Sequence, residues 1–525
     1  MRFFNTAGPV DCQRHYCLPP LERLTLAQVL QLIDQQKYFV LHAPRQTGKT
    51  SVLLALMNYL NAQGQYRCVY IDVEIGQSAR EDVAAAMRAV FSELALRADI
   101  VLNDRFIEGI WADVLAKSGP HAAFGEVLSH WAANDPRPAV LLIDEIDALV
   151  GDSLIAVLRQ LRSGYAWRPR NFPQSVILCG VRDVRDYRIH SASEKAIITG
   201  GSAFNIKAES LRLGDFSQTE VTTLCHQHMD ETGQLIASEA LARIWELTQG
   251  QPWLVNALGY ETCFRMPAGQ DRRQPITVEM VEEAKENLIL RRETHLDQLA
   301  DKLDEERVRR VIEPLLAGQG EPARIPVDDL DYVQDLGLIG RGSPLRIANP
   351  IYQEIIPRQL TYSTEVLTAQ ETAWYVNPDG RLEMNRLLAA FQEFFQEHSE
   401  HWVERFQYKE AGPQLLLQAF LQRIVNGGGR IEREYGLGRM RTDLLVIWPY
   451  SGGMQKVVIE LKVLHKSLEQ TLTAGLEQTW AYLDRCGAGD GHLVIFDRTS
   501  GKPWAEKLFR REETVRGRVI TVWGM

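Results

Sequence analysis

A strand pattern followed at once by a glycine-containing loop and a helix pattern constrains this chain most. Residues 36–42 read as a short buried strand, and an apolar helix pattern runs from Thr50 to Leu60. The connecting segment is Ala43, Pro44, Arg45, Gln46, Thr47, Gly48, Lys49 and Thr50. A phosphate-binding loop has a glycine, four residues and then Gly-Lys-Ser/Thr. Gly48, Lys49 and Thr50 fit this pattern, and Ala43 stands at its first glycine.

The residue types of this loop favour a nucleoside triphosphate as its ligand. Backbone N–H groups at the start of a helix surround anions, and the helix dipole favours negative charge there. Lys49 would reach the β- and γ-phosphates of ATP, and the Thr50 hydroxyl would bind Mg²⁺. We therefore predict that the residues from Ala43 to Ser51 bind the nucleotide.

A second acidic motif follows about 95 residues later. The apolar run 138–143 reads as a strand and ends in Asp144 and Glu145. Asp144 would hold Mg²⁺ directly or through water, and Glu145 would polarise the attacking water. Arg182 follows a further strand pattern at 175–180. It is a candidate sensor of the γ-phosphate, and an ion pair at the surface is the alternative.

Strand patterns alternate with helical patterns through the first two hundred residues, which predicts an α/β fold with a parallel sheet. Ligands of such sheets bind at the carboxyl ends of the strands, where both motifs fall. From Phe216 the strand signal fades, and Ser217 with Glu220 forms a capping box that opens a helix. We predict four domains: a P-loop ATPase domain at 1–214, a helical lid at 215–290, a winged-helix-like unit at 291–364 and a further α/β domain at 365–525.

The two motifs, His42–Thr50 and Leu142–Asp147, resemble those of the AAA-like, archaeal-type ATPases of the STAND class. Thr248-Gln-Gly250-Gln-Pro252 is similar to the Gly-x-Pro motif of their lid. The resemblance covers residues 5–360. It implies a switch that exchanges or slowly hydrolyses ATP, often with formation of homo-oligomers, and it places Pro252 near the adenine. Arg14, His15 and Tyr16 are candidates for the adenine pocket on the same ground. A helix-terminating turn is the plainer interpretation of the lid motif.

A cluster of two carboxylates and a lysine is predicted near the C-terminus. Two strand patterns, at 442–448 and 456–464, carry Asp443 on the first and Glu460 and Lys462 on the second. Side chains alternate along a strand, so Glu460 and Lys462 share a face, and a hairpin would bring Asp443 beside them. The carboxylates suit Mg²⁺, and the lysine could stabilise the negative charge that develops as a phosphodiester is hydrolysed.

This layout resembles the PD-(D/E)XK nucleases, in which the three residues have those roles. Thr442 replaces the usual proline. Gln478 and Tyr482, one turn apart on a helix, are similar to a Gln-x-x-x-Tyr motif of some of these nucleases. Glu410 stands where the family's first core helix often adds a metal contact. The resemblance covers residues 380–500 and implies a nucleic-acid partner, with DNA favoured. A solvated ion pair is the plainer interpretation of the Glu-x-Lys sequence.

The distribution of charge along the chain is consistent with an ATPase domain followed by a nucleic-acid-binding domain. Residues 401–525 hold 18 Lys and Arg against 14 Asp and Glu, which leaves 40 against 54 for residues 1–400. A mildly basic end on an acidic chain fits a nucleic-acid site confined to that end, although scatter explains it equally well.

Seven dispersed cysteines predict reduced thiols and neither a disulfide framework nor a zinc site. Without an apolar run of about 20 residues, we expect a cytoplasmic protein with no membrane partner.

Three functions compete at this stage. The first is an ATP-gated, Mg²⁺-dependent nuclease, whose architecture suits conditional cleavage in defence or in mobile elements. The second is a signalling ATPase in which an inactive nuclease fold serves as a binding module. The third is a DNA-binding regulator with a winged helix and an ATPase switch.

Overall fold

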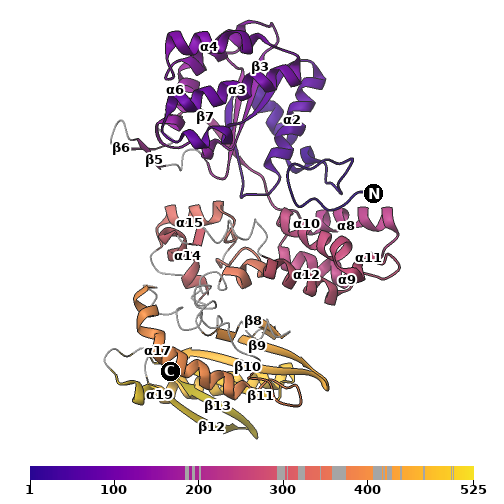
Figure 1. Cartoon of the computed structure of the whole chain (residues 1–525), viewed down its shortest axis with the longest axis vertical. Helices are drawn as coiled ribbons and strands as arrows, with labels where there is room; N and C mark the ends of the chain where they lie inside the picture. The colour runs from indigo at the N-terminus through magenta and orange to yellow at the C-terminus, as the bar shows by residue number, and fades with distance from the viewer. Residues whose placement is uncertain are drawn as a thin grey trace. The chain divides into compact units, whose positions relative to one another are not determined.

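The structure is a computed structural model of the chain (Figure 1). It separates into two compact units, the first made of Met1–His295 and Pro326–Ile351, the second of Leu296–Ile325 and Tyr352–Met525. The residues described are 1–183, 188–191, 196–199, 203–291, 302–303, 305–316, 325–342, 344–356, 374–405, 417, 420–421, 429–437, 440–464, 467–497, 499 and 502–525.

A parallel five-stranded sheet, in the order β2-β3-β4-β1-β7, forms the centre of the first unit. Its strands are β1 (Tyr38–His42), β2 (Arg67–Asp72), β3 (Ala139–Asp144), β4 (Ser175–Gly180) and β7 (Lys207–Arg212). The predicted α/β class is confirmed, and the strands predicted at 36–42, 138–143 and 175–180 are present as β1, β3 and β4. Strand β7 was missed because it lies at the edge of the sheet and carries a polar sequence that shows no apolar alternation.

Helices cover both faces of this sheet (Figure 1). Successive strand residues point to opposite faces, so Phe39 and Leu41 pack on one side while Tyr38 and Val40 pack on the other. The first side is covered by α1 (Leu26–Asp34) and α2 (Lys49–Gln63), and the second by α3 (Val83–Leu102), α5 (Ala123–Ala133) and α6 (Gly151–Gly164), with α4 (Phe106–Ser118) against α3 and α5. The core is therefore a three-layer sandwich that fixes the ends of the strands.

A helical lid follows the sheet in the same unit. Its helices are α8 (Gln218–Thr232), α9 (Ser238–Thr248), α10 (Pro252–Tyr260), α11 (Pro267–Gln270) and α12 (Val278–Arg291). The predicted capping box is present, because Ser217 and Glu220 exchange hydrogen bonds at the start of α8. The N-terminal residues pack on this lid: Phe4 is fully buried, meets the Tyr16 ring edge-on and lies against Gly259, where a Cβ would come within 2.8 Å of its ring.

The predicted winged-helix region is described in part. It contains α14 (Glu306–Leu316), α15 (Val327–Asp335) and an antiparallel bridge between Ile339 and Ile347. Of these, α15 and the bridge belong to the first unit, whereas α14 belongs to the second. Glu410, one of the predicted site residues, lies outside the described residues.

The second unit contains a mixed six-stranded sheet in the order β12-β13-β11-β10-β9-β8. Its strands are β8 (Arg430–Leu437), β9 (Met440–Tyr450), β10 (Gly453–Val463), β11 (Asp490–Phe496), β12 (Phe509–Val515) and β13 (Arg518–Gly524). One face packs against α17 (Met384–Arg405), and the other packs against α19 (Leu468–Cys486). The strand patterns at 442–448 and 456–464 and the helix that carries Gln478 and Tyr482 are present as β9, β10 and α19.

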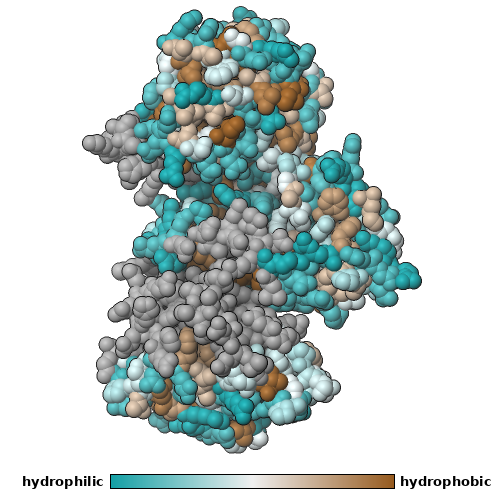
Figure 2. All heavy atoms as spheres, in the orientation of Figure 1, coloured by the Kyte–Doolittle hydropathy of each residue, from teal (hydrophilic) through white to brown (hydrophobic). Residues whose placement is uncertain are grey.

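The cysteine prediction is wrong at one place. Cys12 and Cys17 form a disulfide, because the N-terminal loop turns back on itself and brings their Cα atoms to 5.1 Å. The other cysteines are free and buried. On the face drawn in Figure 2, hydrophobic residues are interspersed among hydrophilic ones. Within the described part of the chain, no helix is both long enough and apolar enough to span a bilayer.

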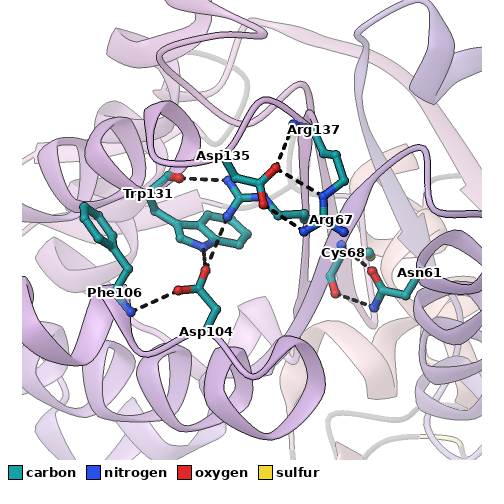
Figure 3. Close-up of polar contacts among 8 residues, drawn as sticks. All are labelled: Asn61, Arg67, Cys68, Asp104, Phe106, Trp131, Asp135 and Arg137. Carbon is teal, nitrogen blue, oxygen red and sulfur yellow. Dashed lines mark hydrogen bonds and ion pairs between the residues drawn. The ribbon is translucent and has the colours of Figure 1, made fainter.

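A buried arginine joins β2 to the helices beside it (Figure 3). Arg67, 2% exposed, donates to the Trp131 carbonyl at 2.9 Å and forms ion pairs with Asp104 at 3.3 Å and Asp135 at 3.7 Å. Its guanidinium lies 5.0 Å from the centre of the Trp131 ring, and the Trp131 indole N–H donates to Asp104 at 2.9 Å. One cation thus satisfies groups from three segments at the end of the sheet opposite the phosphate loop.

Replacing this cation should destabilise the domain strongly. We expect Arg67→Met to lower the free energy of unfolding by about 3 kcal/mol, because two carboxylates and a carbonyl lose a buried cationic donor. The matched variant is Arg137→Met, since Arg137 also pairs with Asp135 but is half exposed. It should cost less than about 1 kcal/mol. Urea unfolding measures both values, and equal losses would contradict the role given to Arg67.

Candidate functional site

The loop between β1 and α2 depends on glycine at its last position. Gly48 has φ +92°, in the left-handed region that favours glycine. A Cβ at this position would also lie 2.7 Å from Nη1 of Arg23. The helix α2 begins at the next residue, Lys49, so its unpaired N–H groups open onto the loop. The sequence therefore forms the anion-binding helix start that the motif predicts.

Lys49 is the cation of this loop. Its side chain is buried, and the ammonium donates to the carbonyls of Ala43 and Pro44, each at 3.1 Å. Neutral carbonyls satisfy the N–H groups of a buried ammonium but do not balance its charge. The position therefore suits a negatively charged ligand.

The carboxylate of Asp144 joins the two predicted motifs. Its Oδ2 accepts hydrogen bonds from the Thr50 hydroxyl at 2.7 Å and the Tyr70 hydroxyl at 3.1 Å, and its Oδ1 accepts from the Glu145 N–H at 3.0 Å. Burial, and then the charge of Asp144, raises the pKa of Tyr70, which keeps the phenol a donor.

Thr50 and Asp144 offer hard oxygen ligands, the kind that Mg²⁺ prefers. Thr50 lines the cavity, whereas Asp144 is fully buried behind it. The pair therefore fits a magnesium ion that the hydroxyl would contact, with the carboxylate acting from behind. No group of three or more His, Cys, Asp and Glu suited to a metal occurs among the described residues.

Glu145 is the second acidic residue of this site. It follows β3 with φ +51° and lines the cavity. Burial raises its pKa to about 7, and Lys49 opposes part of that rise. A carboxyl group with a pKa near neutrality can accept a proton from water at physiological pH. The geometry is thus compatible with the predicted role of activating water.

A cavity of about 600 Å³ lies over the phosphate loop. It is lined by the loop and the first turns of α2, by the N-terminal segment, by the ends of β2 and β3 and by lid residues. The lid and linker members are Phe216, Leu224, Pro252, Trp253 and Asn256. Most of these lid and linker residues are aromatic or apolar, whereas the loop and the end of β3 contribute Lys49, Thr50 and Glu145. Such a division fits a ligand with a flat base at one end and phosphates at the other.

Most predicted nucleotide-binding residues meet in this cavity. Gln46, Thr47, Gly48, Lys49, Thr50, Ser51 and Glu145 line it, as do Pro252 and Tyr16. Ala43, Pro44, Arg45, Arg14 and His15 are not among its lining residues. Ala43 and Pro44 contribute the carbonyls that hold Lys49. Their direct contact with a nucleotide stays a prediction.

Arg182 lies elsewhere. It is buried and forms an ion pair with Asp335 of α15 at 3.6 Å, with its guanidinium 4.8 Å from the centre of the Tyr332 ring. His42, at the end of β1, lies 3.9 Å from the same carboxylate, and burial lowers its pKa to about 4. Arg182 does not line the cavity, so its role as a γ-phosphate sensor stays a prediction.

Several cavity residues were not predicted. Tyr70 and Asp72 lie at the end of β2, and Asp72 stands in register with Asp144 on the neighbouring strand. An acidic residue ending a predicted strand was a usable signal for Asp72. Residues 5–10 and Arg23 had no such signal, because only the tertiary structure brings the N-terminal segment over α2, where the Val10 N–H donates to the Ser51 hydroxyl at 2.9 Å.

In the second unit, β10 carries the predicted Glu-x-Lys pair. Glu460 is 2% exposed, and the Lys462 ammonium donates to its carboxylate at 2.8 Å. Ile459 pairs with Leu444 on β9 as the last pair of this ladder, so Glu460 and Asp443 are the next residues on their two strands. Val458 and Leu445, two residues before Glu460 and two after Asp443, pack on the α19 face. By strand alternation, positions 443 and 460 belong to that same face.

The helix on that face carries the remaining predicted residues. Tyr482 of α19 is buried in the cluster that contains Val458 and Leu445. Gln478 precedes it by one turn and is half-buried. Both therefore lie on the helix that covers the Glu460 face.

These features define a P-loop nucleotide-binding domain in the first unit. Residues 33–187 match the family described as an AAA domain. This part of the chain is a P-loop ATPase domain of the AAA type, which supports the prediction of an ATP-hydrolysing enzyme. The match covers neither the lid nor the second unit, so the STAND class and the nuclease fold stay predictions.

Solved structures show low overall similarity to the chain. A Walker-type ATPase of Pyrococcus abyssi is 15% identical, with 67% of this chain and 99% of that chain covered and a TM-score of 0.43. The RuvB Holliday junction branch migration motor of Thermotoga maritima is 14% identical over 64% and 93%, with a TM-score of 0.34. Cdc6p of Pyrobaculum aerophilum is 17% identical over 65% and 93%, with a TM-score of 0.33. A comparison with curated protein sequences gave no match.

The raised pKa of Glu145 has a consequence for stability. Its folded pKa of about 7 exceeds the ordinary glutamate pKa of 4.5, so the folded state binds more protons between these values. Stability contributed by this group is therefore present at low pH and is lost as the pH rises towards and through 7. We expect Glu145→Gln to reduce the loss of unfolding free energy between pH 5 and pH 8.

Urea unfolding of the ligand-free protein at several pH values measures this slope. Glu108→Gln, on the exposed side of α4, is the matched control. An unchanged slope in Glu145→Gln would rule out the proton uptake assigned to this carboxyl group.

Proposed function

We propose that this protein is a STAND-like switch that binds and hydrolyses ATP and controls a magnesium-dependent nuclease in its C-terminal residues. The nucleotide half is carried by one observation: the hydrogen bond between Thr50 and Asp144, which places the two predicted magnesium residues together beneath the phosphate loop. Two motifs about 95 residues apart in sequence meet there, as a nucleotide–magnesium complex requires.

The residues of this site divide the chemistry. The start of α2 and Lys49 would bind the phosphates, and Thr50 with Asp144 would hold Mg²⁺, which would supply positive charge against the phosphate oxygens. Glu145 would orient a water molecule and accept its proton. The Tyr70 hydroxyl would fix the orientation of Asp144.

The lid motif supports a STAND-like switch. Gly250 has φ +78°, and a Cβ there would come within 1.9 Å of the Phe216 carbonyl oxygen. The Phe216 N–H donates to the Gly250 carbonyl at 2.8 Å, and α10 starts at Pro252, which lines the cavity. The joint between sheet domain and lid is thus packed beside the ligand cavity, where nucleotide state could change it. Homo-oligomer formation belongs to this proposal through the resemblance alone.

Replacing Lys49 tests whether the loop binds ATP or has only a structural role. We expect Lys49→Ala to lower kcat/KM for ATP by at least about 100-fold, because the cation that stabilises the phosphates is lost. Phosphate release with Mg²⁺ measures the rate. Lys117→Ala, at the exposed end of α4, should behave as wild type. Equal turnover by both variants and the wild type would refute the ATPase proposal for this site.

The nuclease half is supported by the Glu460 face. A buried glutamate costs free energy unless it is paired or binds a cation. Glu460 accepts a hydrogen bond from Lys462 and directly follows Ile459, which pairs with Leu444, the neighbour of Asp443. Asp443 and Glu460 would share Mg²⁺, while Lys462 would stabilise the charge on the scissile phosphate. Gln478 would assist from α19, and the family resemblance implies a further metal contact from Glu410. The substrate class would be nucleic acid, with DNA favoured.

Cleavage assays decide between this proposal and an inactive binding module. With Mg²⁺ or Mn²⁺, with and without ATP, the wild type should hydrolyse DNA. Asp443→Ala and Glu460→Gln should each lower the rate at least about 100-fold while ATP binding stays unchanged, because only the metal ligands of the second unit are lost. Glu512→Gln, on the outer strand β12 of the same sheet, is the control.

The alternatives give different results in the same assays. A signalling ATPase with a binding module would turn over ATP and would not cleave DNA with any nucleotide. A winged-helix regulator would bind a specific duplex even after removal of residues 365–525.

A further inference from the structure

Arg23 connects the phosphate loop to the approach of the lid. It ends the short helix η1 (Pro20–Arg23), before α1. Its guanidinium donates to the carbonyl of Thr47, in the phosphate loop, and to the carbonyl of Gly214 at 2.7 Å, in the connection from β7 to α8. It also lies 4.7 Å from the centre of the Phe216 ring. One side chain therefore contacts both segments that a moving lid would separate.

The charge of this guanidinium is poorly balanced. Among the residues that the structure describes, no carboxylate forms an ion pair with Arg23, and its hydrogen-bond partners are neutral carbonyls. The charges of Glu220 and Asp215 reach it only at longer range, and Glu220 accepts the Ser217 N–H in the capping box. Burial lowers the pKa of Arg23 to about 10.

The guanidinium also lines the cavity that contains Lys49 and Thr50. A partly buried cation is unfavourable unless a counter-ion accompanies it, and an arginine fork matches the oxygens of a phosphate group. The two carbonyl contacts leave other N–H groups of the fork able to donate. An anion in this cavity would supply the missing negative charge.

We propose that Arg23 binds a phosphate group of the nucleotide and thereby links the phosphate loop to the lid. This inference rests on the proposed nucleotide function and adds a second cation, from a part of the chain outside the loop motif, to the recognition of the phosphates. Because the same guanidinium holds the Gly214 carbonyl and stacks on Phe216, its engagement by phosphate acts on the segment that leads into α8.

A purely structural bracket is the competing explanation. In that case Arg23 would serve only through its carbonyl contacts, and its loss would weaken every ligand of the cavity equally. Phosphate recognition predicts instead a loss that grows with the number of phosphates. Adenosine, AMP, ADP and ATP therefore discriminate between the two roles.

The experiment measures dissociation constants of these four ligands by calorimetry, with Mg²⁺, for the wild type, Arg23→Gln, Arg23→Lys and the control Arg105→Gln. Arg105 is exposed and pairs with Asp99 on the surface. Arg23→Gln should weaken ATP binding about 10- to 100-fold, the effect of losing a charged hydrogen-bond donor, and leave adenosine within about twofold. The salt dependence of ATP binding should also decrease, since one cation fewer meets the phosphates.

Arg23→Lys keeps the positive charge, so it should lose less affinity for ATP than Arg23→Gln. If Arg23→Gln fails to fold, Arg23→Lys still tests the proposal. ATP binding as in wild type by either variant, or an equal loss for adenosine and ATP, would overturn the role given to Arg23. A wild-type protein that binds none of the four ligands would instead refute the nucleotide function itself. Normal Arg23 variants beside a defective Lys49→Ala would leave that function intact and remove only this inference.

Discussion

The hydrogen bond between Thr50 and Asp144 is the contact on which the nucleotide site depends. It exists because β1 and β3 run parallel in one sheet, with their carboxyl ends at the same edge. The loop after β1 turns into α2 there, and β3 ends in the buried carboxylate. Tyr70 from the next strand completes the bonding of Asp144. Any change in the register of these strands would separate the hydroxyl from the carboxylate.

Above this edge, the charged groups are buried with incomplete compensation. Lys49 donates hydrogen bonds to carbonyls, Glu145 has a pKa raised by burial, and Arg23 contacts carbonyls and an aromatic ring. In the ligand-free chain each of these arrangements costs free energy. A nucleotide with magnesium would offset those costs together, because it brings phosphate oxygens to the cations and a divalent cation to the carboxylates. The ATPase domain therefore has a site in which binding energy and stability are coupled.

The acidic residues of the second unit occupy a different kind of position in their sheet. Its carboxylates belong to neighbouring antiparallel strands rather than to loops at a sheet edge, so the register of β9 and β10 decides which positions are opposed. A shift by one residue would move Asp443 to the other face. The candidate metal site of the second unit therefore depends on the register of β9 and β10 and is independent of the ATPase domain.

Local sequence patterns determined the parts of this protein whose physical cause is local. The apolar runs of β1 to β4, the glycine at position 48 and the capping box before α8 were each predictable, because short-range backbone geometry and strand burial require those residues. The acidic ends of strands were equally visible, although Asp72 was overlooked. The edge strand β7 was not, since a half-exposed strand shows no strong pattern.

The tertiary structure alone decided which distant groups meet. The N-terminal segment covers α2 and lines the cavity, Arg23 reaches both Thr47 and Gly214, and Arg182 pairs with Asp335 instead of facing the cavity. The Cys12–Cys17 bond likewise follows from how the N-terminal loop turns. Such contacts depend on how helices and loops pack over long sequence separations, and no local propensity encodes them. Sequence patterns thus specified the chemistry of the phosphate loop, and packing specified which other residues surround it.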